Sequence, residues 1–216
     1  MNGWWVLLLL IVLSALPVLA VLLWIRFRRL PVRLPWFLAS LLGGALSLGL
    51  AAVLQNLFPK TGEASIGVLL VKIFIQIALT EELGRLVVFS LLLSLARRFS
   101  KEAESRQPAF AAITGLIAGL GFAVIETAMY GVGNFSIALV RAVTTAPLHG
   151  ACGARIGIAV SQIRDTPVWA LVRFLYAVGI HGMYNFMILN QGIPLVFPVL
   201  IAFTALFSSI QLIRFQ

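Results

Sequence analysis

Seven long runs of apolar residues fill most of the chain, and short segments with polar residues, proline or glycine separate them. Each run reaches the length of roughly 20 residues that an α-helix needs to cross a bilayer. The runs occupy residues 4–25, 36–57, 66–96, 108–130, 135–163, 167–190 and 193–213. This pattern predicts an all-α, polytopic membrane bundle of about seven transmembrane helices, forming one integral membrane domain over residues 1–216.

Two runs are long for a single crossing. Because residues 66–96 and 135–163 exceed the usual length, we expect their helices to tilt, bend or protrude from the membrane. Pro147 lies inside the fifth run and should kink it, since proline removes a helical hydrogen bond and clashes with the preceding turn.

The charges between the runs predict the orientation of the bundle. Basic residues are concentrated in alternate connections, as is typical of cytoplasmic loops. Ten basic residues fall on the predicted inner side: Arg26, Arg28, Arg29, Arg33, Arg97, Arg98, Lys101, Arg106, Arg164 and Arg214. Lys60 alone falls in a loop on the other side. We therefore expect a multi-pass protein of the cytoplasmic membrane with its N-terminus outside and its C-terminus inside. No positive charge precedes the first run, which favours a membrane helix over a secretory signal peptide.

The amino-acid composition limits the kinds of partner and site that the chain can have. The chain is 61% hydrophobic and only 11% charged, so almost none of it is expected to be soluble. Its net charge of +9 lies mainly next to predicted helix ends, which favours anionic lipids at the cytoplasmic face over nucleic acid as a partner. Cys152 is the only cysteine, which excludes an internal disulfide and a multi-cysteine metal site.

Two adjacent carboxylates, Glu81 and Glu82, stand in the middle of the third run. One charged side chain at the bilayer centre costs roughly 3 kcal/mol, so such residues usually serve a function. Arg85 follows four residues after Glu81 and three after Glu82, on the same helix face. Arg85 can therefore neutralise one carboxylate and leave the other free to act. Spacing alone does not say which one, and a purely structural ion pair is the alternative.

Three other runs carry polar residues at a similar depth. Glu126 shares a helix face with Phe122, and His181 shares one with Asn185, while His149 lies midway along the fifth run. Glycines on the fourth and fifth runs predict close helix packing around these groups. Carboxylates, histidines and an amide that meet in a dry cavity suit general acid–base hydrolysis of an amide bond.

These motifs resemble those of a known family. The sequences EELGR at 81–85, FAVIE at 122–126, His149, and HGMYN at 181–185 resemble, in this order, the PrsW intramembrane proteases, within the wider CAAX-prenyl-protease and bacteriocin-processing superfamily. The resemblance covers roughly residues 66–190. Arg85 stands where PrsW proteins usually have lysine, and Thr127 where they usually have asparagine, and the second departure leaves the substrate open.

The resemblance implies a role for each residue. Glu81 would be the base that activates water, with Glu82 and Arg85 as its charged support. His149 and His181 would orient water or accept protons. Asn185 would help to hold the oxyanion, and Glu126 stands where the prenyl-protease branch has histidine. The implied substrate is a membrane-anchored protein, of the kind of an anti-sigma factor.

A metal and two other functions remain alternatives. The sequence requires no cofactor, but the ligand types suit zinc, which Glu126, His149 and His181 would bind while Glu81 acts as base. Carboxylates and histidines at the membrane midplane also build the proton relays of transporters. A non-catalytic scaffold is the third reading, because the anterior-pharynx-defective subunit of γ-secretase resembles the same superfamily.

Overall fold

The computed structural model describes residues 3–30, 32–59, 65–99, 107–131, 135–190 and 192–214, in which all regular structure is helical. The elements are α1 (Gly3–Arg28), α2 (Leu34–Gln55), α3 (Ile66–Val71), η1 (Lys72–Leu79), α4 (Thr80–Phe99), α5 (Pro108–Gly131), α6 (Phe135–Gln162), α7 (Pro167–Leu189) and α8 (Val196–Arg214). Since α3, η1 and α4 follow one another without a break, the described part contains seven helical rods, one for each predicted apolar run. Lys60, Lys101 and Arg106, which entered the charge count, lie outside the described residues.

Four described helices, α2, α5, α7 and α8, are long and apolar enough to cross a membrane. Large apolar side chains cover their outer surfaces, among them Leu46, Trp169 and Phe207, each about two-thirds exposed. In water such a surface would be costly, whereas lipid chains solvate it. The all-α prediction is confirmed, and the chain is a polytopic helical membrane protein.

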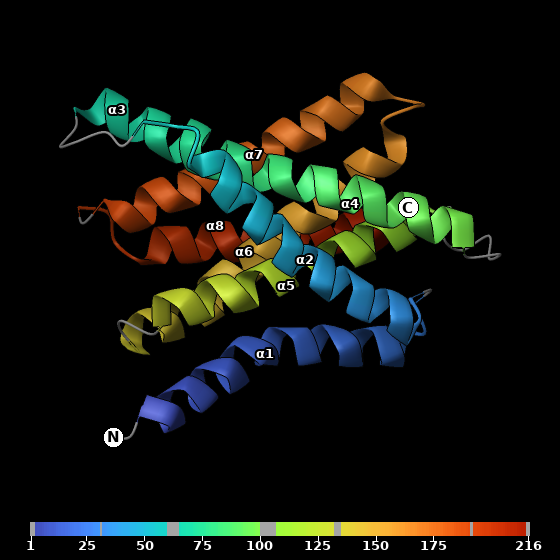
Figure 1. The fold of residues 1–216 in the computed structure, drawn as a ribbon, viewed down its shortest axis with the longest axis horizontal. Helices are drawn as coiled ribbons and strands as arrows, with labels where there is room; N and C mark the ends of the chain where they lie inside the picture. Colours follow the sequence, from blue (N-terminus) through green and yellow to red (C-terminus); the bar gives the residue numbers. More distant parts are fainter. Residues whose placement is uncertain are drawn as a thin grey trace.

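The two central helices are α5 and α6, and the other helices pack around them (Figure 1). Helix α1 lies along α5 and α6 at one edge of the bundle, and α2 packs between α5 and α4. On the other side, α7 contacts α6 and η1, and α8 contacts α6. Four successive helices, α4, α5, α6 and α7, therefore meet around a common interior.

Glycine allows α5 and α6 to approach each other closely. A Cβ atom at Gly119 would lie 2.0 Å from the backbone oxygen of His149, and one at Gly115 would lie 2.2 Å from the oxygen of Gly153. No side chain fits in either place, so the backbones themselves are in contact. The predicted close packing is confirmed, and it fixes the part of α6 that carries His149.

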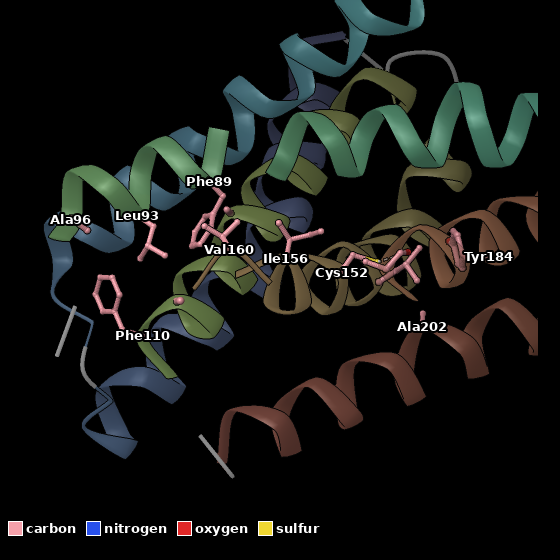
Figure 2. Packing of buried hydrophobic residues seen from close by; sticks show 13 residues of the cluster. Phe89, Leu93, Ala96, Phe110, Cys152, Ile156, Val160, Tyr184 and Ala202 are labelled. Carbon is pink, nitrogen blue, oxygen red and sulfur yellow. Dashed lines mark hydrogen bonds between the residues drawn. The ribbon is translucent and has the colours of Figure 1, made fainter. Parts of the chain in front are cut away.

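A buried apolar cluster runs along the interior from the end of α4 to the middle of α7 (Figure 2). Ala96 and Phe110 are at one end of this cluster and Tyr184 is at the other. Cys152 is fully buried within it, and its Sγ lies 3.6 Å from the oxygen of Ala177. The cysteine is thus a core residue that packs against the backbone of α7.

The helix that carries the glutamate pair changes its winding just before that pair. Residues Lys72–Leu79 form a π-helix, and an α-helix resumes at Thr80. The hydroxyl of Thr80 donates to the oxygens of Gln76 and Ile77, at 2.5 and 3.0 Å. A π-segment adds residues to a turn and so rotates the next part of the helix about its axis, and such segments often occur at functional sites. Pro147, where a kink was expected, lies inside α6, and the α-helix continues on both sides of it.

Candidate functional site

Glu82 and Arg85 form an ion pair inside the bundle. They lie three residues apart on α4, and the Nη1 of Arg85 donates to both carboxylate oxygens of Glu82 at 2.5 Å. Glu82 is 0% and Arg85 1% exposed, so water screens neither charge. The guanidinium also lies 4.6 Å from the ring centre of Phe122 on α5, a cation–π contact. Arg85 thus neutralises one of the two neighbouring carboxylates.

Glu81 is held differently, although it is the next residue. Its Oε1 accepts a hydrogen bond from Nε2 of Gln55 on α2, at 3.3 Å. Its Oε2 is buried without a hydrogen-bond partner, and the nearest cationic candidate is Nε2 of His181, at 3.6 Å. An unpaired buried carboxylate oxygen is costly, so it is expected to serve a ligand or a reacting group.

His181 reaches the glutamates from α7. Its Nδ1 lies 2.8 Å from Oε1 of Glu82. A carboxylate only accepts hydrogen bonds, so Nδ1 carries a proton. The other ring nitrogen, Nε2, faces the unpartnered Oε2 of Glu81. An imidazole nitrogen and a free carboxylate oxygen therefore meet at one point in the interior.

His149 links α4 to α5 from its place on α6. Its Nδ1 lies 3.0 Å from Nη2 of Arg85, and its Nε2 lies 2.8 Å from Oε2 of Glu126. The guanidinium can only donate, so Nδ1 accepts and Nε2 donates to Glu126. The rings of His149 and His181 meet edge to face at 4.9 Å between centres. One hydrogen-bonded network thus connects Glu82, Arg85, His149 and Glu126.

Glu126 lies at the outer boundary of this network. Its Oε2 is 2.6 Å from Nη2 of Arg141 on α6, and Arg141 in turn stacks over the ring of Tyr130 at 4.1 Å. Glu126 and Arg141 are 13% and 14% exposed, unlike the deeper groups. Glu126 therefore forms an ion pair with Arg141 in addition to its bond with His149.

A cavity of about 500 Å³ adjoins these groups. Glu81, Glu126, Arg141 and Asn185 line it together with apolar side chains of η1, α6 and α7 and with Leu195. A carboxylate, an amide and an arginine thus border a space large enough for a segment of extended peptide. Tyr130, Leu189 and Leu195 on its wall are more than half exposed, so the cavity connects the candidate site to the surroundings of the bundle.

Three of these residues could hold a metal ion. Glu81, His149 and His181 each offer one ligand atom, and the three atoms lie within 4.8 Å of one another. Oε2 of Glu81 and Nε2 of His181 are available as they stand. The bond from His181 to Glu82 is the kind of support that metal-binding histidines usually have. Both nitrogens of His149 are engaged, so it would have to release Arg85 or Glu126 to bind.

The metal group differs from the one that the sequence suggested. Glu81 takes the place of Glu126, because Glu126 is turned toward Arg141 and the far side of the His149 ring. The donor set of one carboxylate and two imidazoles nevertheless fits a zinc ion with an open coordination position.

The structure brings the predicted residues together. Glu81, Glu82, Arg85, Phe122, Glu126, His149 and His181 are linked by the contacts above, and Asn185 lies with Glu81 and Glu126 on the wall of the cavity. Sequence reasoning missed Gln55 and Gln76. Nε2 of Gln76 lies 3.4 Å from the backbone oxygen of Gln55, so the two glutamines support Glu81 in turn. Their polarity in apolar runs was the only signal available.

One protein family matches the chain over most of its length. A model of the family described as PrsW family intramembrane metalloprotease matches residues 32–210, which is most of the chain and includes every element of the site. No curated protein and no solved structure matches the chain. On the strength of the family match, the chain belongs to the PrsW family of intramembrane metalloproteases.

Proposed function

We propose that this protein is an endopeptidase that hydrolyses a peptide bond of a membrane-anchored protein, with water activated by Glu81. The observation that carries the proposal is the unpartnered Oε2 of Glu81, buried beside Nε2 of His181 on the wall of a cavity. Glu82 cannot take this role as readily, since both its oxygens are engaged by Arg85.

The residues around Glu81 divide the reaction among them. Oε2 of Glu81 accepts a proton from water, and the resulting hydroxide oxygen forms a bond to the carbonyl carbon of the substrate. The amide of Asn185 donates to the oxygen that becomes negative. The proton then passes to the leaving nitrogen as the peptide bond breaks, and His181 stands next to Glu81 to share it.

Glu82 and Arg85 act as positioning residues. Arg85 holds Glu82, and Glu82 holds the Nδ1–H of His181, so Nε2 stays directed at the reacting region. Gln55 fixes the other oxygen of Glu81 in the same way. A bundle interior that excludes bulk water strengthens each of these interactions.

Zinc fits the same residues. A zinc ion held by Glu81, His181 and His149 would act as a Lewis acid on the water and on the peptide carbonyl, and Oε2 of Glu81 would then be a metal ligand instead of the base. In that alternative Glu126, next to His149, would be the carboxylate left to accept the proton from water. We propose that the substrate is a single-span protein of the anti-sigma-factor kind, which enters from the membrane. The proposed topology of the bundle is seven spans with the N-terminus outside.

The test uses the isosteric variant Glu81→Gln. The purified protein is reconstituted in vesicles with single-span membrane proteins, and new N-termini are identified by mass spectrometry. We expect Glu81→Gln to abolish new termini and Asp165→Asn, an exposed acid on the α6–α7 connection, to leave them unchanged. Cleavage by Glu81→Gln at the normal rate would exclude Glu81 as the base. Proton flux across the vesicles that depends on Glu81 would instead favour a transporter.

A further inference from the structure

A second buried cation, Arg155 on α6, lies away from the candidate site. It is 3% exposed. Its guanidinium donates to two backbone oxygens and to the hydroxyls of Ser208 and Ser209 on α8, and it lies 5.1 Å from the ring centre of Tyr176 on α7. All these partners are neutral, and no carboxylate within the described ranges forms an ion pair with it. A buried charge is ordinarily paired with an opposite one, so Arg155 points to an anionic ligand.

Arg155 opens onto a cavity of about 430 Å³ between α6, α7 and α8. Arg173, Trp169, Tyr176 and Gln211 also line it, and none of the described residues on its wall is acidic. The lining residues come from the last turns of α6 and α8 and the first turns of α7, which share one side of the bundle. Arginine, tryptophan and tyrosine at this level are typical of the head-group layer of a membrane.

An apolar groove of about 700 Å³ continues from this basic cavity, and the two share Tyr176 and Ser208. Apolar side chains of η1, α7 and α8 line the groove, and on α7 they lie deeper in the bundle than Arg173. Gly179 is part of the wall, and a Cβ atom there would meet nothing within 4 Å. The basic cavity near the membrane surface therefore leads into the apolar groove, which runs toward the bilayer centre.

We propose that α6, α7 and α8 bind one anionic phospholipid, with its phosphate against Arg155 and Arg173 and an acyl chain in the groove beside Gly179. Charge complementarity selects the head group, since the described lining of the cavity contains two guanidiniums and no carboxylate. Position selects a lipid over a soluble anion, because the groove opens among the lipid-facing side chains Leu175 and Met183.

The first experiment tests the head group. The protein is incorporated into nanodiscs of phosphatidylglycerol and phosphatidylcholine in equal amounts, and lipid that stays bound after release is measured by native mass spectrometry. We expect one retained phosphatidylglycerol, and about fivefold less in Arg173→Gln, the effect of removing one basic contact to an anionic lipid. Arg28→Gln, an exposed arginine at the end of α1, is the matched control and should retain the lipid. Arg173 is chosen because Arg155 also joins α6 to α8, so its loss would disturb folding.

The second experiment tests the groove. Gly179→Leu fills the channel without touching another atom at its Cβ, and Gly49→Leu adds the same side chain at an exposed position of α2 with equally open space. We expect Gly179→Leu to lose the retained lipid and Gly49→Leu to keep it. Equal retention of both lipids, unchanged retention in Gly179→Leu, or equal occupancy by inorganic phosphate alone would each overturn the proposal. Because lipid mass is the readout, the result does not depend on proteolysis.

Discussion

Nδ1 of His181 lies 2.8 Å from Oε1 of Glu82, and this bond between α7 and α4 directs the other nitrogen of the ring at Glu81. Two adjacent glutamates thereby receive different tasks. Glu82 is bound by Arg85 and His181, whereas Glu81 keeps one oxygen without a partner. The network, and not the position of the residues in the sequence, distinguishes the two carboxylates.

Substitution by glutamine should lower the stability of the protein at Glu82 but leave it nearly unchanged at Glu81. Glu82→Gln leaves Arg85 buried without a carboxylate, and removing one partner of a buried ion pair costs about 3–5 kcal/mol. Glu81→Gln keeps an oxygen that can accept from Gln55, so we expect a stability close to that of the unsubstituted protein. Thermal unfolding in one detergent would measure both. An equal loss of stability in the two variants would contradict the division of roles.

Arg85→Lys should fail to replace arginine even though it keeps the charge. The guanidinium uses Nη1 for Glu82 and Nη2 for His149, and a single ammonium group cannot occupy both places. We expect the melting temperature to fall by less than in Glu82→Gln, since the ion pair survives. Proteolytic activity should fall by about tenfold or more, because a misplaced catalytic group loses much of its effect. Full activity in Arg85→Lys would show that the bond to His149 is dispensable.

Metal content distinguishes the two candidate ligand sets. If zinc binds where the ligand atoms converge, Glu81→Ala and His181→Ala should lose it, while Glu126→Gln should retain it. Glu82→Gln should weaken binding by about 10–100-fold, the usual effect of losing the group that orients a ligating histidine. Elemental analysis of purified protein after dialysis against a chelator-buffered zinc solution would measure this. Zinc loss in Glu126→Gln with retention in Glu81→Ala would restore the set that the sequence suggested.

Gly119→Ala should separate the two central helices. The added methyl group would lie 2.0 Å from the backbone oxygen of His149, so α5 and α6 must move apart. We expect a loss of about 1–3 kcal/mol, as is typical of overpacking, together with weakened activity because His149 moves. The control is Gly49→Ala, where the added Cβ meets nothing within 4 Å. Comparable melting temperatures for the two alanine variants would contradict the close packing.

Much of this arrangement could be predicted from the sequence, because membrane solvation imposes strong rules. Apolar runs define the helices, and charged residues inside those runs define the interior, so spacing could predict that Arg85 pairs with Glu81 or Glu82, but not with which of them. The partner of each histidine could not be predicted, since rotation of α7 and α6 about their axes decides it. Nor could the π-helix Lys72–Leu79, because its apolar sequence fits an α-helix equally well.

Which glutamate lies with the two histidines in the candidate metal site could not be predicted from the sequence either. Glu126 and Glu81 are both acids within predicted membrane helices, and only the side-chain directions show that Glu81 lies with the two histidines. Arg141 turns Glu126 away, which spacing along two separate helices cannot reveal. The bond from Gln55 to Glu81 could not be predicted for a related reason, since Gln55 lies at the end of α2, which is not one of the four helices that carry the sequence motifs.

The orientation of the Glu81 carboxylate should depend on Gln55, because Gln55 is the only described side chain that donates a hydrogen bond to it. In Gln55→Leu, Oε1 of Glu81 loses its donor, and the carboxylate can rotate away from His181. We expect the turnover number to fall by about tenfold, with little change in the Michaelis constant, because one hydrogen bond to a charged group is worth about 1.5–3 kcal/mol. Gln55→Glu should be worse, since two like charges would then face each other. Gln76→Leu, which removes only the support for the backbone of residue 55, should have a smaller effect. Equal activity in Gln55→Leu and the unsubstituted protein would show that Glu81 is positioned by its own helix alone.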